Sequence, residues 1–344
     1  MTRFFLGADL GATKSHLLIA DEDGRAVAFA AGGNANHEVV GFDRVTVVFR
    51  DLLSEALGTA GIGLDRIAGA GLGISGFDWP SERPAHDEAL VAAGLTGIPV
   101  EIVNDAVVGL LAGAADGWGV GLVAGTGCNC WGISPDGRYG RVLGLGNRVG
   151  EFAGGSALVE RAVWAVARAW TRRGPETALT DAFVRWARVR DADDFLESYC
   201  ERRLVVPSSL APMVFDVAAA ADEVAVECVA WAGRELADLA VGVIRQLRLE
   251  ALPFDLVLIG SLFNGGDLLT GPMRAAIHDV APLARPVRLT TPPVLGGVVL
   301  AMARAHVDVR DRYGPLVATT RAIRPEGTGQ LPDGRDVIEL PIPT

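Results

Sequence analysis

Two stretches of this sequence look like copies of one device, and together they indicate its fold. Residues 8–15 read ADLGATKS, and residues 123–129 read VAGTGCN. Each joins an apolar strand to a second strand, which closes at an Asp-Gly hairpin turn, at residues 23–24 and 136–137. Glycine in such a turn lets a ligand approach the backbone, and consecutive N–H groups form a concave anion site. Two copies, one in each half of the chain, predict a phosphate chain held between two domains.

Both turns carry the residue types that phosphate binding needs. Threonine offers a hydroxyl, and lysine offers a point charge. The predicted phosphate-binding residues are Gly11, Thr13 and Lys14 in the first turn and Gly125, Thr126 and Gly127 in the second. Lys14 is the only lysine in the chain, and a phosphate contact or a solvated strand position explains it equally well.

Length and composition favour two packed globular domains. The chain has 344 residues, of which 50% are hydrophobic. We expect one α/β domain over residues 1–116, a second over residues 117–323, and an extended tail over residues 324–344. The apolar stretch 214–252 is interrupted by charged residues, which predicts either one long buried helix or a bent pair.

Charge and the absence of targeting signals narrow the class of protein. The formal net charge of −11 argues against a nucleic-acid partner. The N-terminus enters a strand without the regions of a signal peptide, and no apolar run approaches the ~20 residues of a membrane span. We therefore expect a cytoplasmic protein that contacts no membrane. The four cysteines are expected to be reduced thiols: Cys128, Cys130, Cys200 and Cys228.

Candidate catalytic carboxylates stand where strands end. Three strands followed by alternating helices and strands, twice over, predict two α/β domains of like topology. Asn104 and Asp105 lie at a strand–helix junction, where open α/β sheets place active sites. Asp105 is the candidate general base for phosphoryl transfer, and a helix N-cap is a compatible alternative. Asp9, at the end of the first strand, is a candidate Mg²⁺ ligand or an ordinary capping residue.

Other polar residues at loops and strand ends suit a polyhydroxylated ligand, which needs several convergent polar groups. These residues are Asn36, Ser75, Asn104 and Glu151. Gly144 precedes Glu151 in a glycine-rich loop that can wrap a sugar. Gly260 and Ser261 follow an apolar strand and can admit an adenine face, or form a plain tight turn.

With these residues placed, the chain resembles the family of N-acetylglucosamine kinase and the BadF/BadG/BcrA/BcrD ATPases, in the sugar-kinase/actin/Hsp70 superfamily. The similarity runs in order through about residues 4–305. Its strongest stretches are residues 9–15, 34–37, 73–76 and 103–137, which are specific only in combination.

The resemblance implies two ribonuclease-H-like domains with a central cleft for ATP and Mg²⁺, the first binding sugar and phosphate and the second binding nucleotide. It implies that Asp105 is the base for the 6-hydroxyl of an amino sugar. N-acetylglucosamine is the first candidate, and glucosamine or another hexosamine is the second. The implied sugar-binding residues are Asn36, His37, Ser75, Gly76, Asn104, Asp105, Gly144 and Glu151. A homodimer is also implied.

One motif departs from the family pattern. Members carry Gly-Asp-Glu-Gly-Ser after a Gly-Trp-Gly loop, whereas this chain reads GLG at residues 144–146 and GEFAGG at residues 150–155. Phe152 replaces the second carboxylate, which favours a changed amino-sugar preference or weaker activity. This chain likewise has Gly260-Ser261 where family members have a Gly-Gly pair. Two rival hypotheses follow: an ATPase activator of a reductase or dehydratase, whose cysteines hold an iron–sulfur cluster, and a sugar sensor without catalysis.

Overall fold

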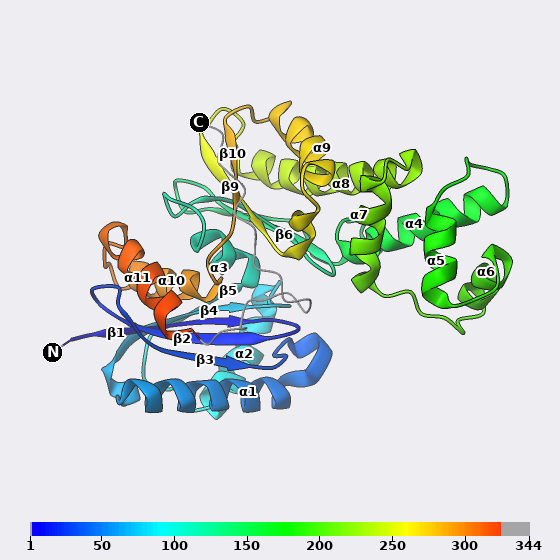
Figure 1. The fold of residues 1–344 in the computed structure, drawn as a ribbon. Coiled ribbons are helices and arrows are strands. Elements are labelled where there is room, and N and C mark those ends of the chain that lie inside the picture. Colours follow the sequence, from blue (N-terminus) through cyan, green and yellow to red (C-terminus); the bar gives the residue numbers. More distant parts are fainter. Residues whose placement is uncertain (1, 325–344) are drawn as a thin grey trace. The chain divides into compact units, whose positions relative to one another are not determined.

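The computed structural model describes residues 2–324, which form two compact units, each with its own five-stranded sheet (Figure 1). The first unit combines residues up to 119 with those from 287 onward, and the second contains residues 120–286. The predicted α/β fold class with two domains is therefore confirmed. None of the described helices is long and apolar enough to cross a membrane.

The sheet of the first unit is mixed. Its strands lie in the order β3 (Ala26–Gly32), β2 (Ser15–Asp21), β1 (Phe4–Leu10), β4 (Ile67–Ile74) and β5 (Val100–Asn104). Strand β2 is antiparallel to β1 and β3, whereas β1, β4 and β5 run parallel. The three parallel strands therefore end at the same edge of the sheet.

One face of this sheet is covered by α1 (His37–Ala60) and α2 (Arg83–Ala92) (Figure 1). Alternate strand residues such as Leu6 and Leu17 form a buried cluster there with Phe49 of α1, as the two-residue period of a strand requires. Helix α1 contains a kink at Gly41, whose φ of 74° is not helical. The first turn of α1 is thus set apart from the rest of the helix.

The opposite face is covered by α10 (Val294–Arg304), which also contacts α3 (Asp105–Leu111). The helix approaches the strands at backbone distance, because glycines face it. A Cβ placed on Gly297 would lie 2.6 Å from the Gly71 carbonyl oxygen and 2.9 Å from the Gly7 Cα. Side chains at these positions would hold α10 away from the sheet.

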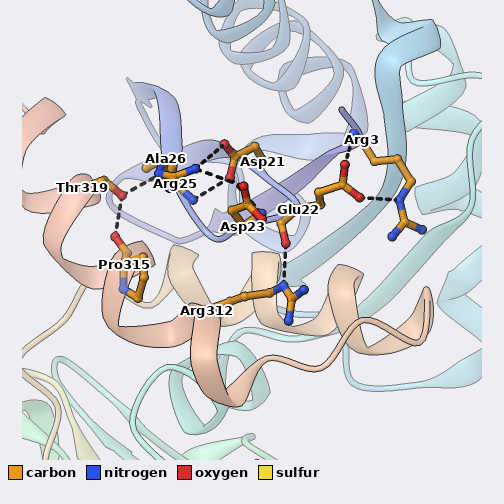
Figure 2. A network of polar contacts seen from close by, with 9 residues as sticks. All are labelled: Arg3, Asp21, Glu22, Asp23, Arg25, Ala26, Arg312, Pro315 and Thr319. Atoms are coloured by element: carbon orange, nitrogen blue, oxygen red, sulfur yellow. Dashed lines mark hydrogen bonds and ion pairs between the residues drawn. The ribbon is translucent and has the colours of Figure 1, made fainter. Parts of the chain in front are cut away.

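Helix α11 (Arg310–Ile323) is tied to the β2–β3 hairpin by polar contacts, which Figure 2 shows. The Arg312 guanidinium donates to the Glu22 carbonyl, and the Ala26 N–H donates to the Thr319 hydroxyl at 2.9 Å.

The predicted domain boundaries differ from the two units of the structure at the C-terminal end of the second domain. Residues 294–323 were assigned to the second domain, but they pack on the first sheet. From residue 325, the expected tail lies outside the described residues.

The second unit repeats the plan of a sheet with packed helices. Its strands lie in the order β10 (Ala284–Arg288), β9 (Phe254–Ile259), β6 (Gly119–Ala124), β7 (Cys128–Ile133) and β8 (Tyr139–Arg141). Its helices are α4 (Gly155–Trp170), α5 (Leu179–Ala187), α6 (Ala192–Cys200), α7 (Ala211–Ala219), α8 (Glu223–Leu247) and α9 (Asp267–His278). Helix α8 packs on β7, β8 and α9.

The apolar stretch predicted as one long helix or a bent pair forms two helices, α7 and α8. The break is marked by Ala221, whose φ is 66°. Asp222 then caps α8, because its Oδ1 accepts a hydrogen bond from the Ala225 N–H at 2.8 Å. Residues 220–222, which contain the left-handed Ala221 and the capping Asp222, thus separate the two helices.

Candidate active site

The parallel strands of the first unit bring three predicted residues to one edge. Asp9 of β1 pairs in register with Gly73 of β4, and Ile74 pairs with Asn104 of β5. The Ser75 N–H donates to the Leu10 carbonyl at 2.9 Å, which continues the pairing past the strand ends. Asp9, Ser75 and Asp105 therefore lie at the carboxyl edge of this sheet, and we call this group with Asn36 and Gly76 the first-sheet site.

A chain of hydrogen bonds joins the members of the first-sheet site. The Asn36 Nδ2 donates to the Ser75 hydroxyl at 3.1 Å, and Ser75 is in turn hydrogen-bonded to the Asp105 carboxylate. The Asn36 Oδ1 accepts from the Glu38 N–H at 2.8 Å and so caps α1. Ser75 is thereby held between an amide donor and a carboxylate acceptor, and its hydroxyl orients Asp105.

Asp105 has the electrostatics of a general base. Burial raises its pKa to about 6, although hydrogen bonds from the Ala106 backbone and the Ser75 hydroxyl partly oppose that rise. A carboxylate with a pKa near neutral is a better proton acceptor than one at its ordinary value. The N-cap of α3 is Asn104, whose Oδ1 accepts from the Ala106 N–H at 3.0 Å.

The Asn104 side chain makes hydrogen bonds within the protein. Its side chain is buried, and its Nδ2 donates to the Asp78 carboxylate at 3.0 Å and to the Phe77 carbonyl at 3.3 Å. The amide that was predicted to bind sugar thus caps a helix at one end and holds the turn after β4 at the other.

Asp9 is a second carboxylate with a raised pKa. Burial raises its pKa to about 7, and the charge of Asp105 contributes while Lys14 opposes it. His16 lies across the β1–β2 ladder, with its Nδ1 4.0 Å from the Asp9 Oδ2. Burial lowers the pKa of His16 to about 4, so the imidazole is neutral near pH 7 and does not neutralise Asp9.

These two repelling carboxylates fit a divalent cation. Mg²⁺ is commonly held by one or two carboxylates together with waters and substrate phosphates. Within residues 2–324, no group of three or more His, Cys, Asp or Glu side chains is placed to hold a metal ion alone. Asp9 therefore suits a cation that arrives with phosphate oxygens, and not a fully protein-ligated metal.

Backbone hydrogen bonds hold the first glycine turn in place, and its tip is exposed to solvent. The Gly11 N–H donates to the Lys14 carbonyl at 3.2 Å, and the Gly11 carbonyl accepts from the Ala35 N–H at 3.0 Å. Thr13 and Lys14 are exposed. The turn beside Asp9 thus presents a hydroxyl and an ammonium group to an incoming ligand.

The second unit gathers its own predicted residues at one edge of its sheet. The N-terminus of α4 supports the second turn, because the Gly155 and Ser156 N–H groups donate to the Gly125 and Thr126 carbonyls at 2.8 and 2.9 Å. Gly260 has a φ of 109° and lies directly against the Ala124 backbone, so β6 and β9 end side by side. We call the resulting group the second-sheet turns: Gly125, Thr126, Gly127, Gly260 and Ser261, of which Thr126, Gly127 and Ser261 are exposed.

Glu151 organises a loop of the second unit. Its buried carboxylate accepts hydrogen bonds from the Leu143 and Leu145 N–H groups, at 2.7 and 3.0 Å. Gly144 lies between these donors with a φ of 72°, and a Cβ there would be 3.3 Å from the Asn129 side chain. Glu151 therefore shapes the glycine-rich loop, and Asn129 beside it was missed by sequence reasoning.

His37 lies in an aromatic cluster. Its ring stacks on Phe42 with centroids 4.8 Å apart and meets His86 edge-on at 4.8 Å. The neighbouring Glu38, which sequence reasoning also missed, does face the site. A Cβ placed on Gly76 would lie 3.2 Å from the Glu38 Oε2. The signal for Glu38 was its place two residues after Asn36.

Comparisons with known proteins add to this geometry. The model of the BadF/BadG/BcrA/BcrD ATPase family matches residues 6–296. An N-acetylmuramic acid/N-acetylglucosamine kinase from Clostridium acetobutylicum is 24% identical over 87% of this chain and 98% of that protein. An N-acetyl-D-glucosamine kinase from Dictyostelium discoideum is 25% identical over 87% of this chain and 97% of its own length.

A solved structure shares the fold. It is that of a candidate N-acetylglucosamine kinase from Chromobacterium violaceum, which is 24% identical and superimposes with a TM-score of 0.66. The match covers 87% of this chain and 98% of that one.

Proposed function

The chain belongs to the BadF/BadG/BcrA/BcrD ATPase family, and from this premise we propose that it transfers the terminal phosphate of ATP to a hydroxyl of an amino sugar. The observation that carries the proposal is the first-sheet site, in which Asn36 and Ser75 orient a partly buried Asp105. Phosphoryl transfer needs positioning, charge neutralisation and an acceptor for the attacking hydroxyl's proton. Asp105 provides that acceptor.

The proposed mechanism assigns each group one task. Asn36 and Ser75 bind and orient the sugar, and the Asp105 carboxylate takes the proton of the attacking hydroxyl. The exposed N–H groups and hydroxyls of Thr13 and Thr126 bind phosphate oxygens. When bound with ATP, Mg²⁺ at Asp9 would neutralise charge on the phosphates.

Two curated relatives are named as kinases of N-acetylglucosamine, so this sugar is the first substrate to test, with the 6-hydroxyl as the acceptor. The rival activator hypothesis needs cysteines grouped for an iron–sulfur cluster. Burial raises the pKa of the Cys128 thiol to about 11, and it raises that of Cys130 further. Within residues 2–324, no group of three or more His, Cys, Asp or Glu side chains is placed to hold a metal ion, which supports the kinase over the activator. Cytoplasmic location and a homodimer stay predictions.

The test is a coupled assay of ADP release with Mg·ATP and a panel of sugars. The panel contains N-acetylglucosamine, glucosamine, N-acetylmannosamine, N-acetylmuramic acid, glucose and a blank without sugar. We expect release that depends on an amino sugar, and no release with the 6-deoxy form of the accepted sugar. Hydrolysis that is independent of sugar would favour the activator. No turnover with any sugar, together with tight sugar binding, would favour the sensor.

A further inference from the structure

The carboxylate of Glu38 lies at the first-sheet site with no task in the proposed mechanism. Its Oε2 and the Asn36 Oδ1 would each be 3.2 Å from a Cβ placed on Gly76, so both oxygens line the same small space. Asn36 donates to Ser75, which bonds Asp105. The Glu38 backbone N–H, which donates to the Asn36 Oδ1, is therefore linked through two side chains to the candidate base.

The local fold holds Glu38 in this position. The Glu38 N–H is bonded to the Asn36 side chain at 2.8 Å, and the kink at Gly41 sets this first turn of α1 apart from the rest of the helix. Gly76 has a φ of 85° and no side chain, which leaves space beside the carboxylate. Among residues 2–324, no group hydrogen-bonds or ion-pairs with the Glu38 carboxylate.

The charge around this space is negative. Asp78 is two residues from Gly76 on the same turn, where its carboxylate accepts from Asn104. The Arg83 guanidinium lies away from this space, because it pairs with Asp87 at 2.8 Å and donates to the Val100 carbonyl at the start of β5. A ligand group that enters beside Gly76 thus meets the exposed Glu38 carboxylate, which no residue of the described part of the chain pairs.

We propose that Glu38 determines substrate preference by pairing with the protonated amine of a 2-amino sugar, so that glucosamine is favoured over N-acetylated sugars. This inference rests on the proposed function. An amine next to electron-withdrawing groups is largely protonated at pH 7, whereas acetylation removes its charge. The same carboxylate repels the lactyl carboxylate of N-acetylmuramic acid, which is thereby the least favoured of the three.

The test compares kcat/KM for glucosamine, N-acetylglucosamine and N-acetylmuramic acid in the wild type and in Glu38→Gln. The glucosamine to N-acetylglucosamine ratio should fall on the order of tenfold in the variant, as expected for loss of one charge-assisted hydrogen bond. In the wild type, the ratio should also fall as salt rises. Glu38→Lys should raise the relative rate with N-acetylmuramic acid.

Glu55→Gln is the matched control, because Glu55 is an exposed glutamate 17 residues further along the same helix than Glu38. It should keep the wild-type ratio. A ratio in Glu38→Gln that stays within about twofold of wild type overturns the inference while leaving the kinase intact. If the wild type phosphorylates no sugar, the proposed function fails. Calorimetric titration of glucosamine into both proteins then decides about Glu38, because equal affinities would exclude the pairing.

Discussion

At the scale of single residues, the first-sheet site depends on two carboxylates whose pKa values are raised by burial. Asp105 is held by Ser75, and its pKa of about 6 leaves it ionised and basic near neutral pH. Asp9 is close enough for the two charges to interact. The function proposed for each carboxylate follows from this environment and not from its type alone.

Asp105→Asn should lower kcat by about 10²–10⁴-fold, the range that general-base catalysis contributes. The amide is nearly isosteric but accepts no proton, so the affinity for a non-hydrolysable ATP analogue should stay within about twofold. Steady-state kinetics and calorimetry measure the two quantities. Asp116→Asn, at an exposed aspartate, is the control. Turnover in Asp105→Asn at the control's rate would remove the base assignment.

Asp9 should make the folded protein less stable as pH rises. Its pKa is about 7 when folded, against 3.8 for the ordinary carboxyl, so the folded state binds the proton more tightly. The stability that this proton contributes is fully present below pH 3.8 and is lost as pH rises through about 7. Asp9→Asn should therefore stabilise the protein at pH 8 by on the order of 2–4 kcal/mol, and little at pH 4.

Thermal unfolding in the presence of a chelator measures this difference, because a bound cation would stabilise ionised Asp9 and mask it. Asp23→Asn, at an exposed aspartate of the β2–β3 hairpin, should show no such pH dependence. Equal midpoints for Asp9→Asn and wild type at pH 8 would show that burial does not strain this carboxylate.

At the scale of elements, α10 packs closely on β1 and β4, the strands that carry part of the first-sheet site. Gly297 faces backbone atoms of Ala8 and Gly71 at 2.6–2.8 Å from the position of a Cβ. Backbone cannot move aside as a flexible side chain can. Strand β1, which carries Asp9, and strand β4, which leads into Ser75, are therefore held by direct contact with this helix.

Gly297→Ala should destabilise the protein by about 3 kcal/mol or more, because the added methyl overpacks a backbone contact. Gly58→Ala is the matched control on α1, where the same methyl meets open space and the helix gains about 0.5–1 kcal/mol. Chemical unfolding of both variants measures the difference. If Gly297→Ala is as stable as wild type, α10 does not pack at backbone distance.

At the scale of the whole molecule, the first unit is discontinuous in sequence and the second is continuous. Residues 120–286 run without interruption, whereas α10 and α11 return to the sheet built from the first 104 residues. Each unit has its own buried core, and only the first needs a distant segment to cover its sheet.

The fragment 120–290, which contains all of β10, should therefore fold when expressed alone. The fragment 1–119 should not, because β1 and β4 would expose the face that α10 covers. Joining residues 291–324 to 1–119 through a flexible linker should restore folding, as judged by circular dichroism and cooperative melting. A cooperatively folded 1–119 fragment would show that α10 is dispensable.

The sequence by itself determined the local features of this protein. The two glycine turns, the Asp-Gly hairpins and the strand that leads into Asn104 and Asp105 depend on neighbouring residues, whose conformational preferences act over a few positions. These elements and the carboxylates at strand ends were therefore predictable.

Only the tertiary structure decided which residues meet. It placed α10 on the first sheet, turned His37 toward Phe42 and brought the Glu38 carboxylate to Gly76. Asn104, predicted to contact sugar, is occupied by a helix cap and the Asp78 turn. The physical reason is that contacts between distant segments follow from close packing and from which buried polar groups must be paired. Neither can be read from adjacent residues alone.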